Sequence, residues 1–311
     1  MRFIVASVSF ALILVGLIGE SYGSSLSCHC VAFRLDDIQN YYLNNAQIKV
    51  IDTFQKKNAS LTIGVIGNYF GDDPKLLDYV KQRVEQNNPK IEIANHGWNH
   101  EDFALYNKTE QYTLLLKTNE KTLEFLSRTP SGFITPYNSL NNDTFLALQE
   151  NNLKYISANK TVDPPPYPLT NVTFYRLPET ALTGTLNDEN TAWITYTHNQ
   201  TYAYILDSVL NYGFAVVMMH PQDYTIHDKL NFTNKVDWNQ IRQLKLLIDD
   251  IRNDGFKIVT IDEIPENLNV QQKVPSWVSK IFVWYEKEEI SAEEVITAIK
   301  YLTEKNIVQL E

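Results

Sequence analysis

Short apolar runs alternate with amphipathic stretches along most of the chain after residue 28, and this alternation restricts the fold more than any other feature. Helical periodicity is found at residues 74–87, 108–127 and 235–254. Strand-like runs of β-branched and aromatic residues lie between such stretches: CVAFRL, SLTIGVIG, KIEIAN, GFIT, KYISA, AWITY, FAVVMMH and FKIVTI. Strands that alternate with helices form parallel sheets or barrels. The sequence therefore predicts an α/β fold.

Three segments differ in composition. Residues 1–23 combine one basic residue, an apolar run and the small-x-small triplet SYG, which is the pattern of a secretory signal peptide. An uncleaved anchor is the alternative, because the apolar run is long. Residues 24–267 hold the alternating segments, and a small helical C-terminal module is expected at 268–311. The stretch 161–178 is rich in proline, so we expect a surface loop there.

Charge and export signals restrict the partners. The formal charge of −10 and the pI near 5.1 argue against nucleic acid, because a phosphate backbone needs a basic face. After the leader, no segment has the roughly 20 apolar residues of a spanning helix. N-x-[ST] sequons are typical of an exported glycoprotein, and they begin at Asn58, Asn107, Asn142, Asn159, Asn171, Asn199 and Asn231. We therefore expect a secreted or cell-surface protein.

The two cysteines, Cys28 and Cys30, are separated by one residue. We expect no relaxed disulfide between them, because cysteines so close in sequence do not readily reach disulfide geometry. No framework of bridges is therefore expected to hold the fold together. Lipidation of Cys28 is a weaker alternative, since SSLSC is a poor lipobox.

Candidate reactive groups follow the predicted strands, where those of β/α barrels gather. The first strand ends in FRLDDIQ, with Asp36 and Asp37 adjacent. Neighbours in a regular strand point to opposite faces, so both carboxylates can serve one site only where the strand gives way to a loop. Two other Asp-Asp pairs occur in the chain, so the position after an apolar strand is what distinguishes this pair.

The third strand ends in NHGWNH, which places His96 and His100 four residues apart. If one helical turn follows Gly97, the two imidazoles face the same way and can share a divalent cation. The H-E-x-x-H pattern of metalloproteases is absent. The alternative is two polar residues of an ordinary loop.

Two further strand ends carry candidate groups. In GFITPYNS, Pro136 restricts the backbone and can leave the Tyr137 N–H pointing outward as a donor, although an ordinary turn is the alternative. The apolar strand FAVVMMH ends on His220, which is well placed as an acid or base. The alternative for His220 is a core histidine with a satisfied hydrogen bond.

This ordered set resembles the polysaccharide deacetylases of carbohydrate esterase family 4, the NodB-homology domain, over roughly residues 28–265. The resemblance implies a distorted (β/α) barrel that binds one divalent metal ion, usually Zn²⁺, and removes acetyl groups from N-acetylated sugars. It implies Asp36 as general base and His220 as general acid. It implies a metal site formed by Asp37, His96 and His100.

The resemblance also carries substrate contacts and two departures. Tyr137 would stabilise the oxyanion, with Asn138 and Trp193 as further substrate-binding residues. Gly97 stands where the family usually has a small hydroxyl residue. Ile134 stands where the family has an arginine that steadies the catalytic aspartate, so another group, Asn138 or Arg34, would have to orient Asp36.

The resemblance predicts a secreted metal-dependent deacetylase that acts on a glycan or polysaccharide. The loss of the arginine at Ile134 motivates an alternative, a non-catalytic carbohydrate-binding protein on a degenerate deacetylase scaffold. A glycosidase is disfavoured, because adjacent aspartates lack the ~5 Å separation across a scissile bond. The tail resembles helical modules of exported archaeal proteins and would dock to the cell envelope. Its aromatic residues, Trp277, Trp284 and Tyr285, are expected to form a small core.

Overall fold

The computed structural model describes residues 24–165, 167, 172–272, 281, 284–285 and 290–304. The predicted signal peptide, residues 1–23, lies outside the described residues. The chain separates into one compact unit at Ser27–Leu268 and a second unit formed by Met1–Leu26 and Asn269–Glu311. The larger unit contains every candidate site residue.

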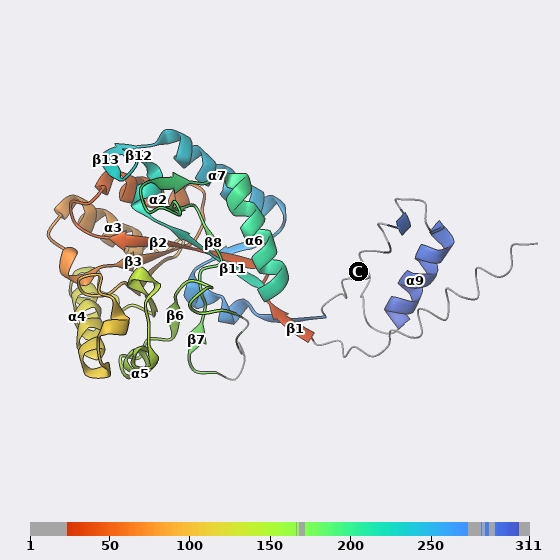
Figure 1. Cartoon of the computed structure of the whole chain (residues 1–311), viewed down its shortest axis with the longest axis horizontal. Helices are drawn as coiled ribbons and strands as arrows, with labels where there is room; N and C mark the ends of the chain where they lie inside the picture. Colours follow the sequence, from red (N-terminus) through yellow and green to blue (C-terminus); the bar gives the residue numbers. More distant parts are fainter. Residues whose placement is uncertain are drawn as a thin grey trace, which may run out of the picture. The chain divides into compact units, whose positions relative to one another are not determined.

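A curled sheet of nine strands forms the centre of the larger unit (Figure 1). Its order is β7-β6-β5-β4-β3-β2-β11-β8, with β14 also paired to β2, and every pair is parallel. The strands are β2 (Cys30–Ile38), β3 (Leu61–Val65), β4 (Ile91–Asn95), β5 (Gly132–Ile134), β6 (Tyr155–Ser157), β7 (Tyr175–Arg176), β8 (Ala181–Leu182), β11 (Phe214–Met219) and β14 (Lys257–Val259). The predicted (β/α) barrel is therefore confirmed, as a half-barrel.

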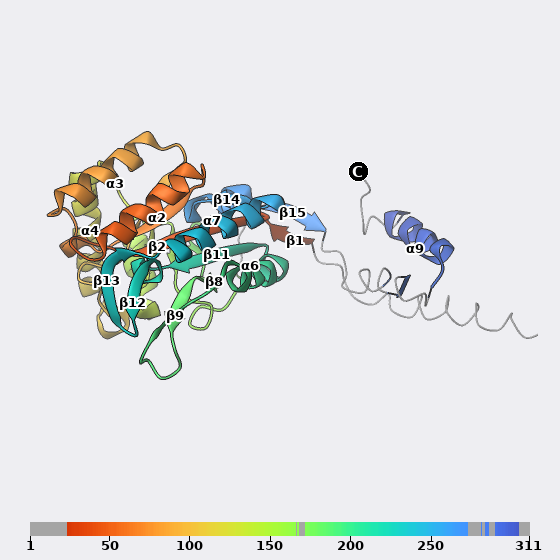
Figure 2. The ribbon, with the colours of Figure 1, turned by 90° about the horizontal axis from the view of Figure 1, so that it is seen from above.

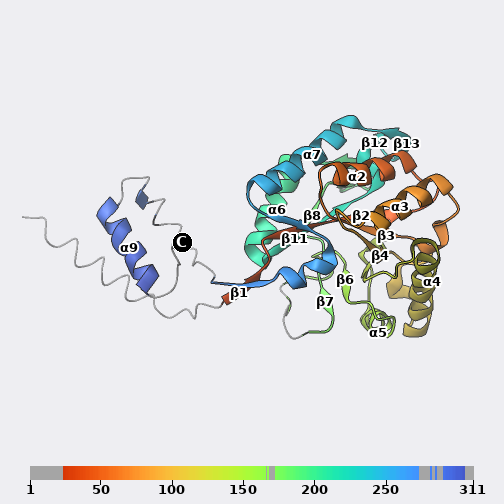
Figure 3. The same cartoon turned by 180° about the vertical axis from the view of Figure 1, so that it is seen from behind.

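Helices surround this sheet (Figures 1 and 3). They are α2 (Asn44–Lys56), α3 (Pro74–Gln86), α4 (Lys108–Leu126), α5 (Asn142–Glu150), α6 (His198–Tyr212) and α7 (Trp238–Asn253). The helices predicted at 74–87, 108–127 and 235–254 are thus confirmed. Their starts follow capping rules: Asp73 accepts hydrogen bonds from two backbone amides of the first turn of α3, and Asp237 does the same for α7.

The two faces of each strand bury different groups. Phe33 and Leu35 belong to the large apolar core that also contains buried residues of α2, α3 and α7. Ala32 belongs to a separate cluster with residues of β6 and β11. Because side chains alternate along a strand, Arg34 and Asp36 share the face of Ala32, inside the half-barrel. The interior of the sheet therefore holds polar groups, while its outer face packs against helices.

Shorter elements complete the larger unit. β12 (Thr225–Asp228) and β13 (Asn231–Val236) form a hairpin that contacts α2 (Figure 2). The run AWITY is a strand, β10 (Trp193–Thr195), but it pairs antiparallel with β9 (Gly184–Leu186) outside the parallel sheet. The 3-10 turns are η1 (Gly67–Tyr69), η2 (Phe103–Leu105), η3 (Pro136–Asn138), η4 (Pro221–Tyr224), η5 (Ile261–Glu263) and η6 (Pro265–Asn267).

Two expectations need correction. Cys28 and Cys30 form a disulfide, because His29 adopts a left-handed backbone (φ 44°) that brings the two Cα atoms to 5.0 Å. The Cys28 sulfur is then not free for lipidation. The proline-rich stretch 161–178, part of which lies outside the described residues, is not a loop throughout, since Tyr175–Arg176 pairs with β6.

In the smaller unit, β1 (Ser24–Ser27) pairs with β15 (Asn269–Gln272), and α9 spans Ala292–Glu304. The strand β15 was not expected in a helical module. Trp284 packs against a small apolar cluster of Ile281 and Val295, whereas Tyr285 is exposed, and Trp277 lies outside the described residues. Across the part of the chain that the structure describes, no helix has the length and apolar character to cross a membrane.

Candidate metal and catalytic site

Asp37, His96 and His100 converge at the carboxyl end of the parallel strands. The Nε2 atoms of both imidazoles lie 3.3 Å from Asp37 Oδ1. One ligand atom from each residue lies within 4.8 Å of the others, so a single cation could contact all three. Asp37 comes from β2, His96 directly follows β4, and His100 lies in the loop after it.

A bulge in β2 allows the adjacent aspartates to serve one site. The pairing of β2 with β3 shifts register between Leu35 and Ile38, and Asp37 has a left-handed backbone (φ 60°). Asp36 keeps the inward direction of the regular strand. The expected position at a loop is therefore wrong, since both residues lie inside β2.

The two histidines were expected to converge through a helical turn after Gly97. They converge instead through a loop. Gly97 (φ 78°) and His100 (φ 61°) both have left-handed backbones, and the imidazole centroids lie 4.9 Å apart. The Glu101 carboxylate accepts hydrogen bonds from the Trp98 and Asn99 amides, which holds the loop in place. A Cβ at Gly97 would lie 2.8 Å from Glu101 Oε2. The left-handed backbone, which residues with a Cβ rarely adopt, favours glycine at this position.

The protonation and hydrogen bonding of the two histidines fit a metal site. His96 Nδ1 lies 2.9 Å from the Ile134 carbonyl oxygen and donates to it in the tautomer that leaves Nε2 as a lone pair. That Nε2 is buried and makes no hydrogen bond with any residue that the structure describes. Burial and the neighbouring His96 lower the pKa of His100 to about 4. A neutral imidazole is the form that binds a cation.

Asp37 is suited to the same role. Burial works to raise the pKa of Asp37, but the contact with His96 and the charge of His220 hold it well below its usual range. Burial works to lower the pKa of His96, but the contact with Asp37 raises it above the ordinary value, so protons compete with a cation for this imidazole. One carboxylate and two imidazoles form the donor set of many catalytic zinc sites. The residues present therefore fit a divalent metal.

Asp36 is buried and contacts an arginine of its own strand. Arg34 Nη2 lies 3.2 Å from Asp36 Oδ2, and the two side chains are 1% and 2% exposed. The second arm of Arg34 donates to the Ser157 carbonyl oxygen at 2.6 Å and the Ser157 hydroxyl at 3.0 Å. Of the two residues proposed to orient Asp36, Arg34 makes the contact. Asn138 Oδ1 is buried without a partner among the described residues.

His220 directly follows β11 and is half-buried beside Trp193. The rings meet edge to face with centroids 5.4 Å apart. The Asp223 carboxylate accepts hydrogen bonds from Trp193 Nε1 (2.7 Å), the His220 amide (2.8 Å) and the Thr183 hydroxyl (2.6 Å). The Asp223 carboxylate thus fixes the Trp193 ring beside His220. Asp223 was not among the residues expected at the site, although an acid three residues after a histidine that follows a strand is a recognisable capping position.

Tyr137 lies at the mouth of the site. Its side chain is 69% exposed, its backbone is left-handed (φ 54°), and its ring meets that of His100 at 4.5 Å between centroids. The Ile134 carbonyl, the usual acceptor for an amide three residues later, is contacted by His96 instead. Within the described ranges, no acceptor takes the Tyr137 N–H. That amide is therefore available to a bound oxygen.

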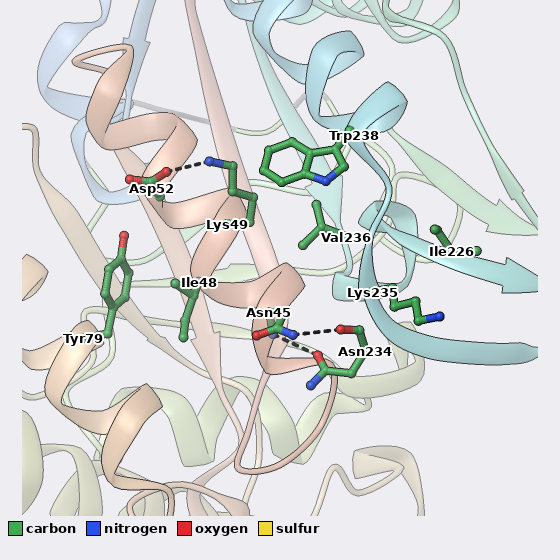
Figure 4. A pocket seen from close by; sticks show the side chains of 10 residues that line it. All are labelled: Asn45, Ile48, Lys49, Asp52, Tyr79, Ile226, Asn234, Lys235, Val236 and Trp238. Carbon is green, nitrogen blue, oxygen red and sulfur yellow. Dashed lines mark hydrogen bonds and ion pairs between the residues drawn. The ribbon is translucent and has the colours of Figure 1, made fainter.

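A separate hollow lies on the flank of the larger unit, between α2, the β12–β13 hairpin and the start of α7 (Figure 4). Its polar groups pair with one another: Asn45 with Asn234, and Lys49 with Asp52. Lys49 Nζ also lies 5.0 Å from the centroid of the exposed Trp238 ring. None of the candidate site residues lines this hollow.

Comparisons with known proteins give a family model and a fold. Residues 23–156 match the model described as "Polysaccharide deacetylase". A protein of Mycobacterium smegmatis assigned to the polysaccharide deacetylases is 16% identical, with a TM-score of 0.57 over 79% of this chain and 92% of that one. A family 4 acetyl xylan esterase from Clostridium thermocellum, solved with a cobalt ion, is 18% identical, with a TM-score of 0.50 over 76% and 89%.

A third similar structure is a CE4 family pseudoenzyme from Bacillus anthracis, 14% identical, with a TM-score of 0.52. The match covers 77% of this chain and 66% of that one, so it spans just under two thirds of the pseudoenzyme. No curated relative matches the chain. At these identities, the structural likeness establishes the fold alone.

Proposed function

Because the chain contains a polysaccharide deacetylase domain with the carbohydrate esterase family 4 fold, we propose that it is a secreted, metal-dependent deacetylase of N-acetylated glycans or polysaccharides. The observation that carries this proposal is the convergence of Asp37, His96 and His100 next to the buried Asp36. A carbohydrate substrate follows from the family. The acetylated sugar is part of the proposal.

Asp37, His96 and His100 would hold the metal ion. We expect Zn²⁺, although aspartate and histidine sites accept several first-row metals, and the esterase of the same fold was solved with cobalt. A bound divalent cation lowers the pKa of water from 15.7 toward ~7 and polarises a carbonyl oxygen. The three side chains would hold that ion close to His100, whose ring meets that of Tyr137.

The remaining site residues move protons and stabilise charge. Asp36 accepts a proton from the water that attacks the acetyl carbon. The Tyr137 N–H donates to the carbonyl oxygen as negative charge develops there. His220 protonates the leaving amine as the carbon–nitrogen bond breaks. The products are acetate and a free amino sugar, with the water's oxygen in the acetate.

The alternative is a non-catalytic carbohydrate-binding protein on the same scaffold. It is favoured by Ile134, which replaces the family arginine, and by the pseudoenzyme among the similar structures. This alternative predicts measurable affinity for glycans without acetate release, whichever metal is supplied.

Metal analysis and acetate release test the two readings together. We expect the purified chain to hold about one divalent ion and to release acetate from members of a panel of N-acetylated and O-acetylated oligosaccharides. Asp36→Asn and His220→Ala should each lose about 10²-fold or more in kcat yet still hold the metal. Matched controls are Asp249→Asn and His198→Ala, which change residues that pair outside the site, with Lys57 and Asp250 respectively. Full activity of both site variants would refute the roles assigned here.

Export and docking belong to the same proposal. The leader and the sequons support a secreted or cell-surface location, and residues 268–311 would dock to the cell envelope. Fractionation of cells that express the full chain or a chain starting at Ser24 tests export, since only the former should leave the cytoplasm.

Sedimentation of the protein with isolated envelopes, with and without residues 269–311, tests docking. Equal sedimentation of the two chains would refute it.

A further inference from the structure

We propose that Arg34 is a positioning residue for catalysis, which orients the Asp36 carboxylate from the same strand and takes over the function of the arginine that Ile134 replaces. This inference rests on the proposed deacetylase function. It opposes the reading of Ile134 as a sign of a decayed site. It also assigns a role to a buried charge that the proposed reaction does not otherwise use.

The contacts of Arg34 fix the direction of its guanidinium. One arm is held by both oxygens of Ser157 on β6, across the interior from β2. The other arm reaches Asp36 Oδ2 at 3.2 Å. Because the guanidinium is a rigid planar fork, fixing one arm fixes the direction of the other. Arg34 therefore holds one oxygen of Asp36 in place.

The Asp36 carboxylate is left with one oxygen for chemistry. Its Oδ1 is buried and has no partner within the described part of the chain. An unpaired buried carboxylate oxygen costs free energy, so a stable protein tends to keep one where a ligand or a reacting proton satisfies it. Arg34 fixes the position of Oδ2, and Oδ1 remains available to accept a proton. This arrangement suits a general base that accepts a proton from one direction.

The alternation of β2 explains how Arg34 replaces an arginine at position 134. Residues two apart on a strand share a face, so Arg34 and Asp36 both point into the half-barrel. Ile134 is fully buried, and its Cδ1 would lie 3.2 Å from a Cβ added at Gly64, whose other neighbours include the Asp36 backbone. An apolar group thus occupies the space beside Asp36. A second arginine there would bring two like charges to one carboxylate.

Glu179 is a second carboxylate near the same arm of Arg34, with 3.8 Å between Glu179 Oε2 and Arg34 Nη2. This distance is longer than that to Asp36 and is beyond hydrogen-bond range. Burial raises the pKa of Glu179, against the opposing charge of Arg34. The charge of Arg34 is therefore directed mainly to Asp36.

A double-mutant cycle tests whether Arg34 acts through Asp36. In the zinc-loaded full chain, Arg34→Met should lower kcat about 10²-fold, leave KM within about threefold and leave the metal content unchanged. Asp36→Asn should lower kcat at least as much. Because Arg34 acts only through Asp36, adding Arg34→Met to Asp36→Asn should cause no further loss.

Two more variants separate positioning from folding. Arg34→Lys keeps the charge but cannot contact Ser157 and Asp36 as a fork, so kcat should fall about tenfold when it is measured well below the melting temperature of the variant. Ile134→Arg in the Arg34→Met background should recover part of the lost kcat. The matched control is Arg176→Met, which removes a partly buried arginine paired with Asp163, and it should keep the wild-type kcat.

The outcomes distinguish the inference from the proposed function. A wild-type chain that holds metal but releases no acetate would overturn both. An active wild type with unchanged kcat in Arg34→Lys would overturn the inference alone. So would losses that multiply in the Arg34→Met/Asp36→Asn double variant, since Arg34 would then act on something other than Asp36. If Arg34→Met does not fold, Arg34→Lys and its combination with Asp36→Asn decide the question.

Discussion

Buried polar groups lie at both ends of the strands, but they are paired at one end and left open at the other. At the carboxyl end, buried atoms without hydrogen bonds among the described residues include Arg34 Nε, Asp36 Oδ1, His96 Nε2, Asn138 Oδ1 and His220 Nδ1. At the opposite end, the buried Glu92 carboxylate accepts from Thr62 at 2.6 Å, Tyr155 at 2.8 Å, the Asp262 amide at 3.3 Å and the Ser131 hydroxyl.

Backbone conformation differs between the site residues and the residues of the Glu92 network. Asp37, His100, Tyr137 and Asn138 all have φ between 54° and 61°, a region that costs free energy for residues with a Cβ. Glu92 and its hydroxyl partners are absent from the residues with positive φ. Strain and unpaired atoms persist where a ligand can use them, whereas a satisfied network stabilises the fold. The carboxyl end should therefore govern activity and the opposite end stability.

The largest expected effect is loss of the metal. His96→Ala and His100→Ala should each abolish metal retention and acetate release, because two ligands do not hold a catalytic cation tightly. Removal of the metal with a chelator should inactivate the wild type, and Zn²⁺ should restore it. Elemental analysis and acetate assays measure both, with His198→Ala as the control. Activity that survives complete metal removal would contradict the assignment.

Loss of the proposed acid should separate activity from stability. His220→Ala should lower kcat about 10²-fold or more, while the free energy of unfolding changes little, because His220 Nδ1 makes no hydrogen bond within the described part of the chain. Kinetics on a defined oligosaccharide and denaturant unfolding measure the two quantities. If unfolding is weakened as strongly as catalysis, the contrast between the two ends fails.

The opposite end should show the reverse. Glu92→Ala leaves the Thr62 and Tyr155 hydroxyls and the Asp262 amide without their acceptor, so the free energy of unfolding should fall by about 3 kcal/mol. The kcat of the folded fraction should stay within about threefold of wild type. Urea unfolding measures the free energy of unfolding. Acetate release divided by the concentration of metal-loaded protein gives the kcat of the folded fraction. A selective loss of kcat would show that the network serves the site.

Stability should also depend on pH through Glu92. Burial, with the charge of Asp262, raises the pKa of Glu92 to about 7. A raised acid pKa means that the folded state binds the proton more tightly, so stability is highest below the unfolded pKa and falls as pH rises through about 7. The difference between wild type and Glu92→Gln should change by about 2 kcal/mol from pH 5 to 8. If the difference in the free energy of unfolding between wild type and Glu92→Gln does not change with pH, Glu92 is ionised in the folded protein throughout this range.

The smallest effect is expected from loss of the hydrogen bond between Trp193 and Asp223, at the carboxyl end of the strands. Trp193→Phe removes the indole N–H that donates to Asp223 but keeps a ring beside His220. One such hydrogen bond has a modest net value, so kcat/KM should fall about threefold. Steady-state kinetics with Trp98→Phe as the control measures it. A loss as large as that of His220→Ala would mean that Asp223 orients the acid directly.

Part of this organisation is predictable from local patterns. The periodicity at 74–87 and 108–127 predicts α3 and α4, since one apolar face per helix must be buried. The positions of Asp36, His96 and His220 after apolar strands indicate an edge of the sheet where reactive groups meet. The strand AWITY has the same local pattern but pairs with β9, because three residues without strong burial can join any available edge.

The site itself depends on backbone details that local patterns do not specify. The bulge at Asp37 and the left-handed backbones of Gly97 and His100 bring the metal ligands together, yet a loop or a helical turn was expected from the residues alone. The disulfide between Cys28 and Cys30 was likewise excluded on spacing and forms through His29. Such conformations are stabilised in part by contacts that are distant in the sequence, such as the hydrogen bond that the Gly97 carbonyl oxygen accepts from the Thr118 hydroxyl of α4.

The sequence by itself determined the alternation of strands and helices, and with it the edge at which the aspartates and histidines gather. Only the tertiary structure decided that Arg34, and not Asn138, contacts Asp36 and that Ser157 on a distant strand holds its other arm. The physical reason is the sequence separation of the contacting residues. Periodicity reports which face of an element is apolar, whereas the partner of a buried charge depends on which side chains the curled sheet brings across its interior.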